Sequence, residues 1–406
     1  MIQQQKSVFA LILLVGLDCM SFGLLIPVLF PLLLDPNHGL LPSSTPLSTR
    51  HLLMAISLSA FPLCALISTP LVGALADKFG RKKILLLCLI GSLAGYCLSA
   101  IAIAFKSFNF FIVGRIIAGA SFGAQPIAQA AVADISTPAT KALNMSLISF
   151  AMTLSITIGP ILGGYLSDTT ISPFFTVVTP FILSALLTLI NVFWLAWSFK
   201  ETPINNTGLP FKELIGEIKC LWNIVYVRKL LIIFFLLEVS WSFYFQCIGL
   251  ILDASFHFNA LTIGKFLSYS GLWMCIGLLI IFRWLYTVLP LKTLACYFLL
   301  MTLTGLFACT LARHPYQQWL TVVIISISVG IAYTTLISLL SNAVAPSLQG
   351  RALSVASSLL TAAWFATGFI GPNLATINLN LPLYIAIITS LLAVITIFSN
   401  LNNKST

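Results

Sequence analysis

Residues 73–83 read Gly73-Ala-Leu-Ala-Asp77-Lys78-Phe-Gly80-Arg81-Lys82-Lys83 and lie between two long apolar runs, 52–75 and 84–104. Each run is long enough for a helix that crosses a bilayer, which needs about 20 apolar residues. The segment between them is so short that it can only form a tight turn, and Gly80 favours such a reversal. The stretch therefore predicts two antiparallel membrane helices joined by a basic loop.

The same apolar pattern continues over the whole chain. Of its 406 residues 59% are hydrophobic and only 7% are charged, whereas a soluble domain carries about 25% charged residues. This composition excludes a soluble globule, a nucleic-acid-binding domain, a secreted disulfide scaffold and a disordered chain. It predicts an all-α polytopic membrane protein. The expected transmembrane helices number twelve: 8–34, 52–75, 84–104, 109–132, 144–166, 174–198, 230–252, 263–284, 292–311, 318–340, 353–376 and 381–400.

The longest polar segment divides these helices into two sets of six. We expect an N-terminal six-helix bundle over 1–198, a central loop over 199–229 and a C-terminal six-helix bundle over 230–406. A Pro-containing basic segment followed by a Gly-Pro pair occurs at 138–160 and again at 346–372. This weak similarity at corresponding helices suggests a parallel repeat with a binding site between the halves.

The distribution of basic residues predicts the orientation in the membrane. The formal net charge is +10, and most of the 20 Lys and Arg residues fall in the loops on the same side as the N-terminus. Basic loops stay in the cytoplasm. We therefore expect both termini to be cytoplasmic, in the cell inner (cytoplasmic) membrane, with anionic lipid rather than nucleic acid as the partner of these charges. The run 8–34 is too long for a signal-peptide core and is expected to be the first membrane helix.

The segment 73–83 resembles the signature loop of the major facilitator superfamily, G-x-L-x-D-R/K-x-G-R-R/K. The resemblance implies that superfamily's fold of two six-helix halves. It also implies an electrostatic latch that breaks and forms again during transport, built from Gly73, Asp77, Gly80 and Arg81. Asp77 and Arg81 are four residues apart and can form an ion pair.

The first apolar run carries an acid at membrane depth. It contains Gly16-Leu-Asp18 and looks like the first helix of the drug–proton antiporter branch, which includes tetracycline-resistance efflux proteins. Asp18 is about ten residues into the helix, hence ~15 Å deep. A carboxylate there is costly unless it is protonated, paired or facing a wet cavity. One interpretation is that Asp18 binds the coupling proton, and the alternative is a polar residue packed against a neighbouring helix.

The fourth run resembles the R-x-x-x-G motif of the family, with Arg115 and Gly119. An arginine keeps its proton and requires an acceptor, for which Asp18 is the first candidate. Protonation of Asp18 would weaken such a pair, so that the pair would sense the proton. Helical spacing places further residues on the face of Arg115, which we expect to line the cavity: Gly119, Phe122, Pro126 and Gln129.

The fifth run resembles the antiporter motif G-P-x-x-G-G at Gly159, Pro160, Gly163 and Gly164. Pro160 favours a bend, and the glycines allow another helix to approach closely. In the superfamily this motif is associated with exporters, which favours efflux. The alternative is a generic flexible packing helix.

The second half carries one acid within an apolar run, Glu238, which shares a helix face with Trp241 and Phe245. A carboxylate beside aromatic rings suits an apolar cation, and Glu238 could instead be a second proton site. Together with residues of the first half, these aromatic side chains give the candidates for the substrate cavity: Phe22, Phe122, Pro126, Gln129, Trp241 and Phe245.

These residues are compatible with three functions to different degrees. The first is a secondary active exporter of a small amphipathic molecule or drug, driven by inward proton flow, with Asp18, Arg115 and Glu238 as the proton-coupling candidates. The second is a proton symporter that imports a nutrient, metabolite or siderophore. The third, an intramembrane enzyme or receptor, lacks clustered histidines and carboxylates. We expect no enzymatic activity, no metal, no cofactor and no need for more than a monomer.

Overall fold

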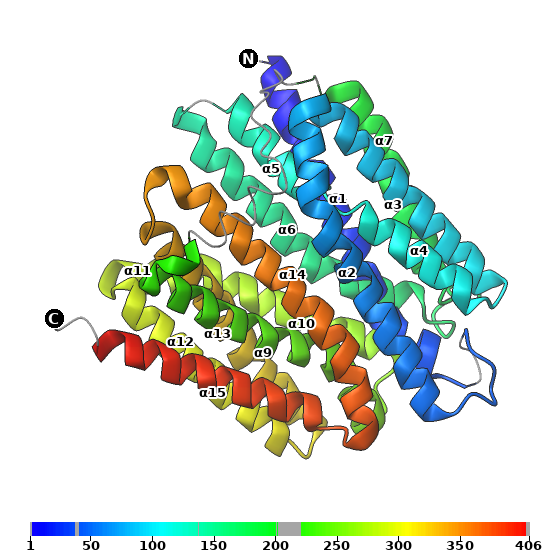
Figure 1. The fold of residues 1–406 in the computed structure, drawn as a ribbon. Helices are drawn as coiled ribbons and strands as arrows, with labels where there is room; N and C mark the ends of the chain where they lie inside the picture. Colours follow the sequence, from blue (N-terminus) through cyan, green and yellow to red (C-terminus); the bar gives the residue numbers. More distant parts are fainter. Residues whose placement is uncertain (1, 37–39, 137, 200, 202–220, 403–406) are drawn as a thin grey trace. The chain divides into compact units, whose positions relative to one another are not determined.

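The structure is a computed structural model that describes all residues except 1, 37–39, 137, 200, 202–220 and 403–406 (Figure 1). Its helices are α1 (Ile2–Leu34), α2 (Leu47–Phe79), α3 (Arg81–Ala104), α4 (Phe108–Ala120), α5 (Ala124–Ile135), α6 (Pro138–Leu166), α7 (Thr179–Ser198), α9 (Val225–Phe256), α10 (Ala260–Ile276), η1 (Gly277–Phe282), α11 (Arg283–Val288), α12 (Leu291–Leu311), α13 (Pro315–Asn342), α14 (Pro346–Ile377) and α15 (Leu381–Asn402).

The described residues form 12 helices or helical runs that are long and apolar enough to cross a membrane. Each of the twelve expected spans overlaps one of them, so the prediction of an all-α polytopic membrane protein is confirmed. The central segment expected to be a loop, 199–229, lies mostly outside the described residues, and its predicted boundaries stay a prediction.

The connection between α2 and α3 is shorter than the sequence suggested. Helix α2 continues to Phe79 and α3 begins at Arg81, so Gly80 alone lies between them. Its φ is +100°, a backbone conformation that costs glycine little and other residues much. Asp77 and Arg81 therefore lie in helices and not in a loop.

The fourth expected helix, 109–132, is interrupted at residues 121–123, between α4 and α5. The Ser68 and Thr69 hydroxyls of α2 donate hydrogen bonds to the carbonyl oxygens of Gly119 and Phe122, at 3.2 and 2.9 Å. Irregular backbone at membrane depth needs such protein partners, because lipid offers none. Side chains of α2 thus stabilise a break that helical periodicity could not predict.

The chain divides into two compact units. Unit 1 comprises Met1–Phe211 and Phe258–Ser268, and unit 2 comprises Lys212–His257 and Tyr269–Thr406. Within unit 1, α1 packs on α6 and α7, and α3 packs on α4 and α7. Within unit 2, α9 packs on α14 and α15, and α12 packs on α13 and α15. Corresponding helices of the two units thus pair in the same way.

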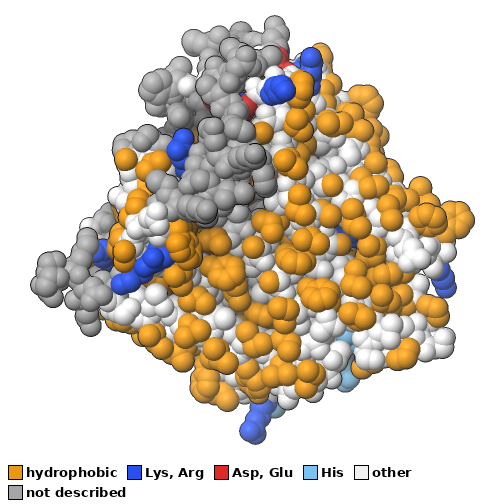
Figure 2. Space-filling view, viewed as in Figure 1, with side chains coloured by type: hydrophobic (Ala, Val, Ile, Leu, Met, Phe, Trp, Pro, Cys, Tyr) orange, Lys and Arg blue, Asp and Glu red, His pale blue; other side chains and the backbone are white. Residues whose placement is uncertain are grey.

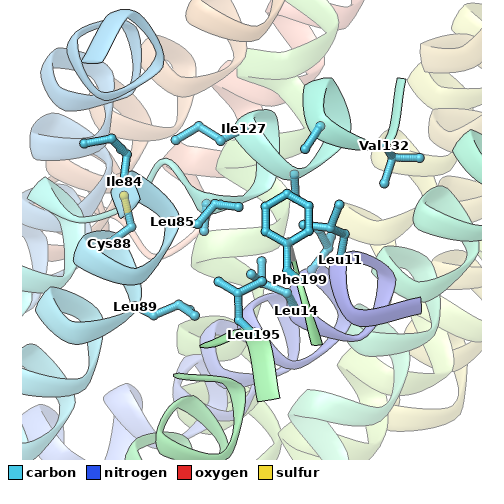
Figure 3. Close-up of a cluster of buried hydrophobic side chains, with 14 of the residues drawn as sticks. Leu11, Leu14, Ile84, Leu85, Cys88, Leu89, Ile127, Val132, Leu195 and Phe199 are labelled. Atoms are coloured by element: carbon cyan, nitrogen blue, oxygen red, sulfur yellow. The ribbon is translucent and has the colours of Figure 1, made fainter. Parts of the chain in front are cut away.

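The core of unit 1 includes a cluster of buried apolar side chains contributed by α1, α2, α3, α5, α6 and α7. Figure 3 shows Phe199, which follows α7, with Leu85 of α3 on one side of its ring and Leu11 of α1 on the other. Side chains of this kind interlock and fix the spacing of the helices that carry them. They hold the helix that carries Asp18 in place.

Apolar side chains also cover much of the outer surface. In Figure 2 hydrophobic side chains dominate the visible face, and most of the visible Lys and Arg side chains lie near its margins. Exposed examples within spans include Phe193, Trp284 and Tyr297. A soluble monomer rarely exposes so large an apolar area, so this surface fits contact with lipid.

Candidate functional site

The polar centre of unit 1 begins with Asp18 on α1. Its side chain is 6% exposed, and Asp18 and Glu238 are the two buried acids among the described residues. Asp18 interacts electrostatically with Cys88 and with the Tyr96 hydroxyl, both on α3. Among the described residues none donates a hydrogen bond or forms an ion pair with its carboxylate. A buried acid without a fixed partner remains able to take up a proton.

Arg115 of α4 lies close to the same tyrosine. Its side chain is 4% exposed, and it interacts electrostatically with the Tyr96 hydroxyl. The expected ion pair with Asp18 is not formed in this structure, because no described carboxylate lies within 4.0 Å of the guanidinium group. Tyr96 thus interacts with both groups, and the sequence analysis missed it, because a tyrosine in an apolar helix carries no distinguishing pattern.

Three phenylalanines form a cluster beside Arg115. The Phe61 ring of α2 lies 5.2 Å from the ring of Phe22 and 5.2 Å from that of Phe122. The Arg115 guanidinium carbon lies over the Phe61 ring, 5.2 Å from its centroid. Phe22 and Phe122 are partly exposed, whereas Phe61 is buried. The structure thus brings two predicted cavity residues together around a third phenylalanine that the sequence analysis missed.

The other expected cavity residues of unit 1 lie beyond the break between α4 and α5. Pro126 is exposed, and the Gln129 side-chain amide lies 3.7 Å from the sulfur of Met152 on α6. The single face predicted from helical spacing is therefore divided. Arg115, Gly119 and Phe122 face α2, while Gln129 faces α6.

The α2–α3 junction holds a cluster of charges. The Nη2 atom of Arg81 lies 3.7 Å from the Asp77 carboxylate, as the spacing suggested, and 2.8 Å from the carboxylate of Asp134 on α5. Glu201 accepts a hydrogen bond of 3.0 Å from the backbone N–H of Lys82 in the first turn of α3. The shorter ion pair is thus to a residue that the sequence analysis missed, since Asp134 is distant in sequence.

The Gly-Pro segment of α6 packs against α1. A Cβ at Gly163 would overlap the carbonyl oxygen of Leu24, and a Cβ at Gly159 would lie 3.0 Å from the Cα of Gly23. Only glycine permits this approach of two backbones. Around Gly73, in contrast, the described residues leave open space within 4 Å. A methyl group added at Gly73 would therefore meet no described atom of another helix.

Unit 2 has its own buried acid, Glu238 on α9, which is 2% exposed. The Trp364 side chain donates a hydrogen bond to it, and Glu238 interacts electrostatically with Tyr333. The Phe245 ring lies 5.1 Å from that of Trp241 and 5.7 Å from that of Trp364. The predicted face of α9 is thus completed by residues of α13 and α14 that the sequence analysis did not select.

No group of three or more His, Cys, Asp or Glu side chains suited to a metal occurs among the described residues. The arrangement of each unit consists instead of a buried acid with aromatic rings nearby, inside a membrane-spanning helical bundle. Such a bundle defines the class of polytopic membrane transport proteins, in which intramembrane acids mark substrate or proton paths.

The chain belongs to the Major Facilitator Superfamily, whose profile matches residues 11–372. Among curated relatives, mouse major facilitator superfamily domain-containing protein 10 is 32% identical over 182 residues, which are 40% of this chain and 39% of the relative. The class H tetracycline resistance protein of Pasteurella multocida is 31% identical over 163 residues, 40% of this chain and 38% of the relative. The matched regions thus span about two fifths of each relative.

Solved structures share the fold over nearly the whole chain. The human organic anion transporter MFSD10 (TETRAN) superposes with a TM-score of 0.74 and 20% identity, over 97% of this chain and 99% of the other. A D-xylose-proton symporter superposes with a TM-score of 0.76 and 15% identity, over 97% of both chains. These likenesses establish the arrangement of helices and leave substrate and direction to be argued from the residues.

Proposed function

We propose that the protein is a proton-coupled secondary active transporter that exports a small amphipathic molecule by alternating access. The observation that carries the proposal is Asp18, a carboxyl group that is buried in a membrane-spanning helix and has no hydrogen-bond donor among the described residues. Such a group is expensive to keep charged in a membrane. A change of protonation there would alter the electrostatic field at Tyr96, which also interacts electrostatically with Arg115.

Two further observations favour export. The sequence relatives include a tetracycline resistance protein, and the Gly-Pro segment of α6 carries the pattern typical of exporters in this superfamily. The partly exposed rings of Phe22 and Phe122 suit an amphipathic molecule, because aromatic walls bind many apolar shapes. Proton symport is the second candidate, since a D-xylose-proton symporter has the same fold. We also propose the inner membrane as the location, with cytoplasmic termini and a monomeric protein.

Direction is tested in proteoliposomes that contain the protein in one orientation, with an imposed pH gradient. A fluorescent tetracycline-like probe and a pH-sensitive dye inside the vesicles report the two fluxes together. Opposed and coupled fluxes of probe and protons are expected. Fluxes in the same direction would reject export and indicate symport. Vesicles without protein give the leak.

The charges at the α2–α3 junction are proposed to control the change of conformation. Asp134→Asn is expected to lower turnover several-fold, more than Asp77→Asn does, because Arg81 lies nearer to Asp134. Substrate affinity should change little in either variant, since the pair lies outside the proposed binding site. Initial rates and binding affinities of the purified variants measure both effects. Asp168→Asn, which replaces a half-buried acid in the turn after α6, is the matched control, and unchanged turnover in Asp134→Asn would count against a latch.

A further inference from the structure

Two buried arginines of unit 1 differ in how their charge is satisfied. Arg50, 2% exposed, donates hydrogen bonds to the carbonyl oxygens of Leu33, Asp35, Pro42 and Thr45. Its guanidinium group thereby holds together the connection between α1 and α2. The guanidinium group has five N–H donors in a fixed planar arrangement, and the four carbonyl oxygens accept hydrogen bonds from it. Arg50 therefore has a structural role that is complete in the protein itself.

Arg115 has no such set of partners. Its side chain is 4% exposed, and its buried Nε atom has no hydrogen-bond partner. No described residue accepts a hydrogen bond from its guanidinium group or supplies a carboxylate within 4.0 Å. The face of the Phe61 ring is its nearest favourable contact. A buried charge that is left unpaired costs several kcal/mol or more, so this arrangement fits a partner that arrives from outside the chain.

We infer that Arg115 is the recognition residue for the anionic group of an aromatic or other apolar organic anion, which lies against Phe22, Phe61 and Phe122. This inference rests on the proposed transport function and names its substrate class. A carboxylate or sulfonate matches the guanidinium group geometrically and in charge. The aromatic rings supply the surface for the apolar body of the molecule.

The test compares three probes with one aromatic body: 2-naphthoate, the neutral 2-naphthamide and the cationic 2-naphthylmethylammonium. Binding to the purified full-length protein in detergent is measured by the shift of its melting temperature and by titration of tryptophan fluorescence. We expect 2-naphthoate to bind about 10- to 100-fold more tightly than the amide, the range for a hydrogen-bonded charge pair. The cation should bind most weakly. Equal affinity for the three probes would overturn the inference.

Variants locate the site. Arg115→Gln should lose the preference for 2-naphthoate and leave the affinity for the amide unchanged, while Arg115→Lys retains part of the preference. Because the replaced charge is unpaired, Arg115→Gln should unfold at the same temperature as the parent protein or higher. Arg283→Gln changes an exposed arginine and is the matched control. Unchanged 2-naphthoate affinity in Arg115→Gln overturns the inference. If that variant does not fold, Arg115→Lys and Phe61→Leu must both weaken 2-naphthoate binding, or the inference fails.

These experiments distinguish a failure of the anion site at Arg115 from a failure of the proposed transport function. Binding does not require coupling, so Asp18→Asn should still bind 2-naphthoate. Arg115-dependent binding of 2-naphthoate without proton-coupled flux would retain the anion site and reject the transport proposal. Coupled flux of the cationic probe that is insensitive to Arg115→Gln would reject the anion site and retain proton-coupled transport.

Discussion

Asp18→Asn is expected to abolish transport driven by a pH gradient while the protein still folds. Asparagine has nearly the shape of aspartic acid and fits the same position in α1, but it can neither take up nor release a proton. Asp18 is the one buried acid of unit 1 among the described residues. No other acid of that unit is placed to take over at the same depth.

The measurement separates coupling from binding. Concentrative uptake or export of a labelled substrate under a pH gradient should fall to the level of protein-free vesicles, whereas substrate binding and the melting temperature should stay close to those of the parent protein. Asp168→Asn replaces a half-buried acid in the turn after α6 in the same way and should behave like the parent protein. Normal pH-driven transport by Asp18→Asn would remove Asp18 from the mechanism, and the alternative of a merely packed polar residue would then hold.

Gly163→Ala is expected to destabilise the protein strongly, by about 3 kcal/mol. The added Cβ would overlap the carbonyl oxygen of Leu24 on α1, an atom that cannot move without shifting the helix. Helices α1 and α6 form the most extensive helix pair in the structure. A displacement there would also move the segment that carries Asp18.

A second glycine provides the matched control. Gly73→Ala adds the same methyl group to another helix, where the described residues leave open space within 4 Å. It should leave the melting temperature unchanged or raise it slightly, since alanine favours a helix. Thermal unfolding of both variants in the same detergent makes the comparison. Equal stability of the two would show that the contact between α1 and α6 is looser than the structure indicates.

Apolar length and glycine positions were sufficient to predict the fold. Twelve apolar runs near the length of a bilayer crossing leave little alternative to a membrane protein of twelve helices. Gly80 marked the reversal between α2 and α3, because few other residues adopt its backbone conformation. The break between α4 and α5 could not be predicted, because it depends on hydroxyl groups of α2. The hydrophobic periodicity of one helix carries no information on the hydrogen-bonding groups that a neighbouring helix supplies.

The buried charges of the candidate site and part of its aromatic residues could be predicted, whereas Tyr96, Phe61, Trp364 and the ion-pair partner Asp134 could not. Charge is conspicuous in an apolar chain, so Asp18, Arg115 and Glu238 were selected. Their partners Tyr96 and Trp364 are ordinary residues until the fold places them beside a charge. The expected pair of Asp18 and Arg115 failed for a related reason. Sequence position gives the depth of a residue in the membrane, but not the direction in which its helix turns it.

The one-residue junction at Gly80 has a mechanical consequence. A single residue supplies two rotatable torsions, so α2 cannot slide along its axis without pulling the start of α3 with it. The end of α2 and the start of α3 are therefore held at a nearly fixed distance from each other. The ion pair of Arg81 with Asp134 ties this junction to α5. The hydrogen bond from the Lys82 backbone to Glu201 ties it to the chain after α7. An axial shift of α2 is therefore passed on to the start of α3, whereas a change in the angle between the two helices can be taken up by the two torsions of Gly80.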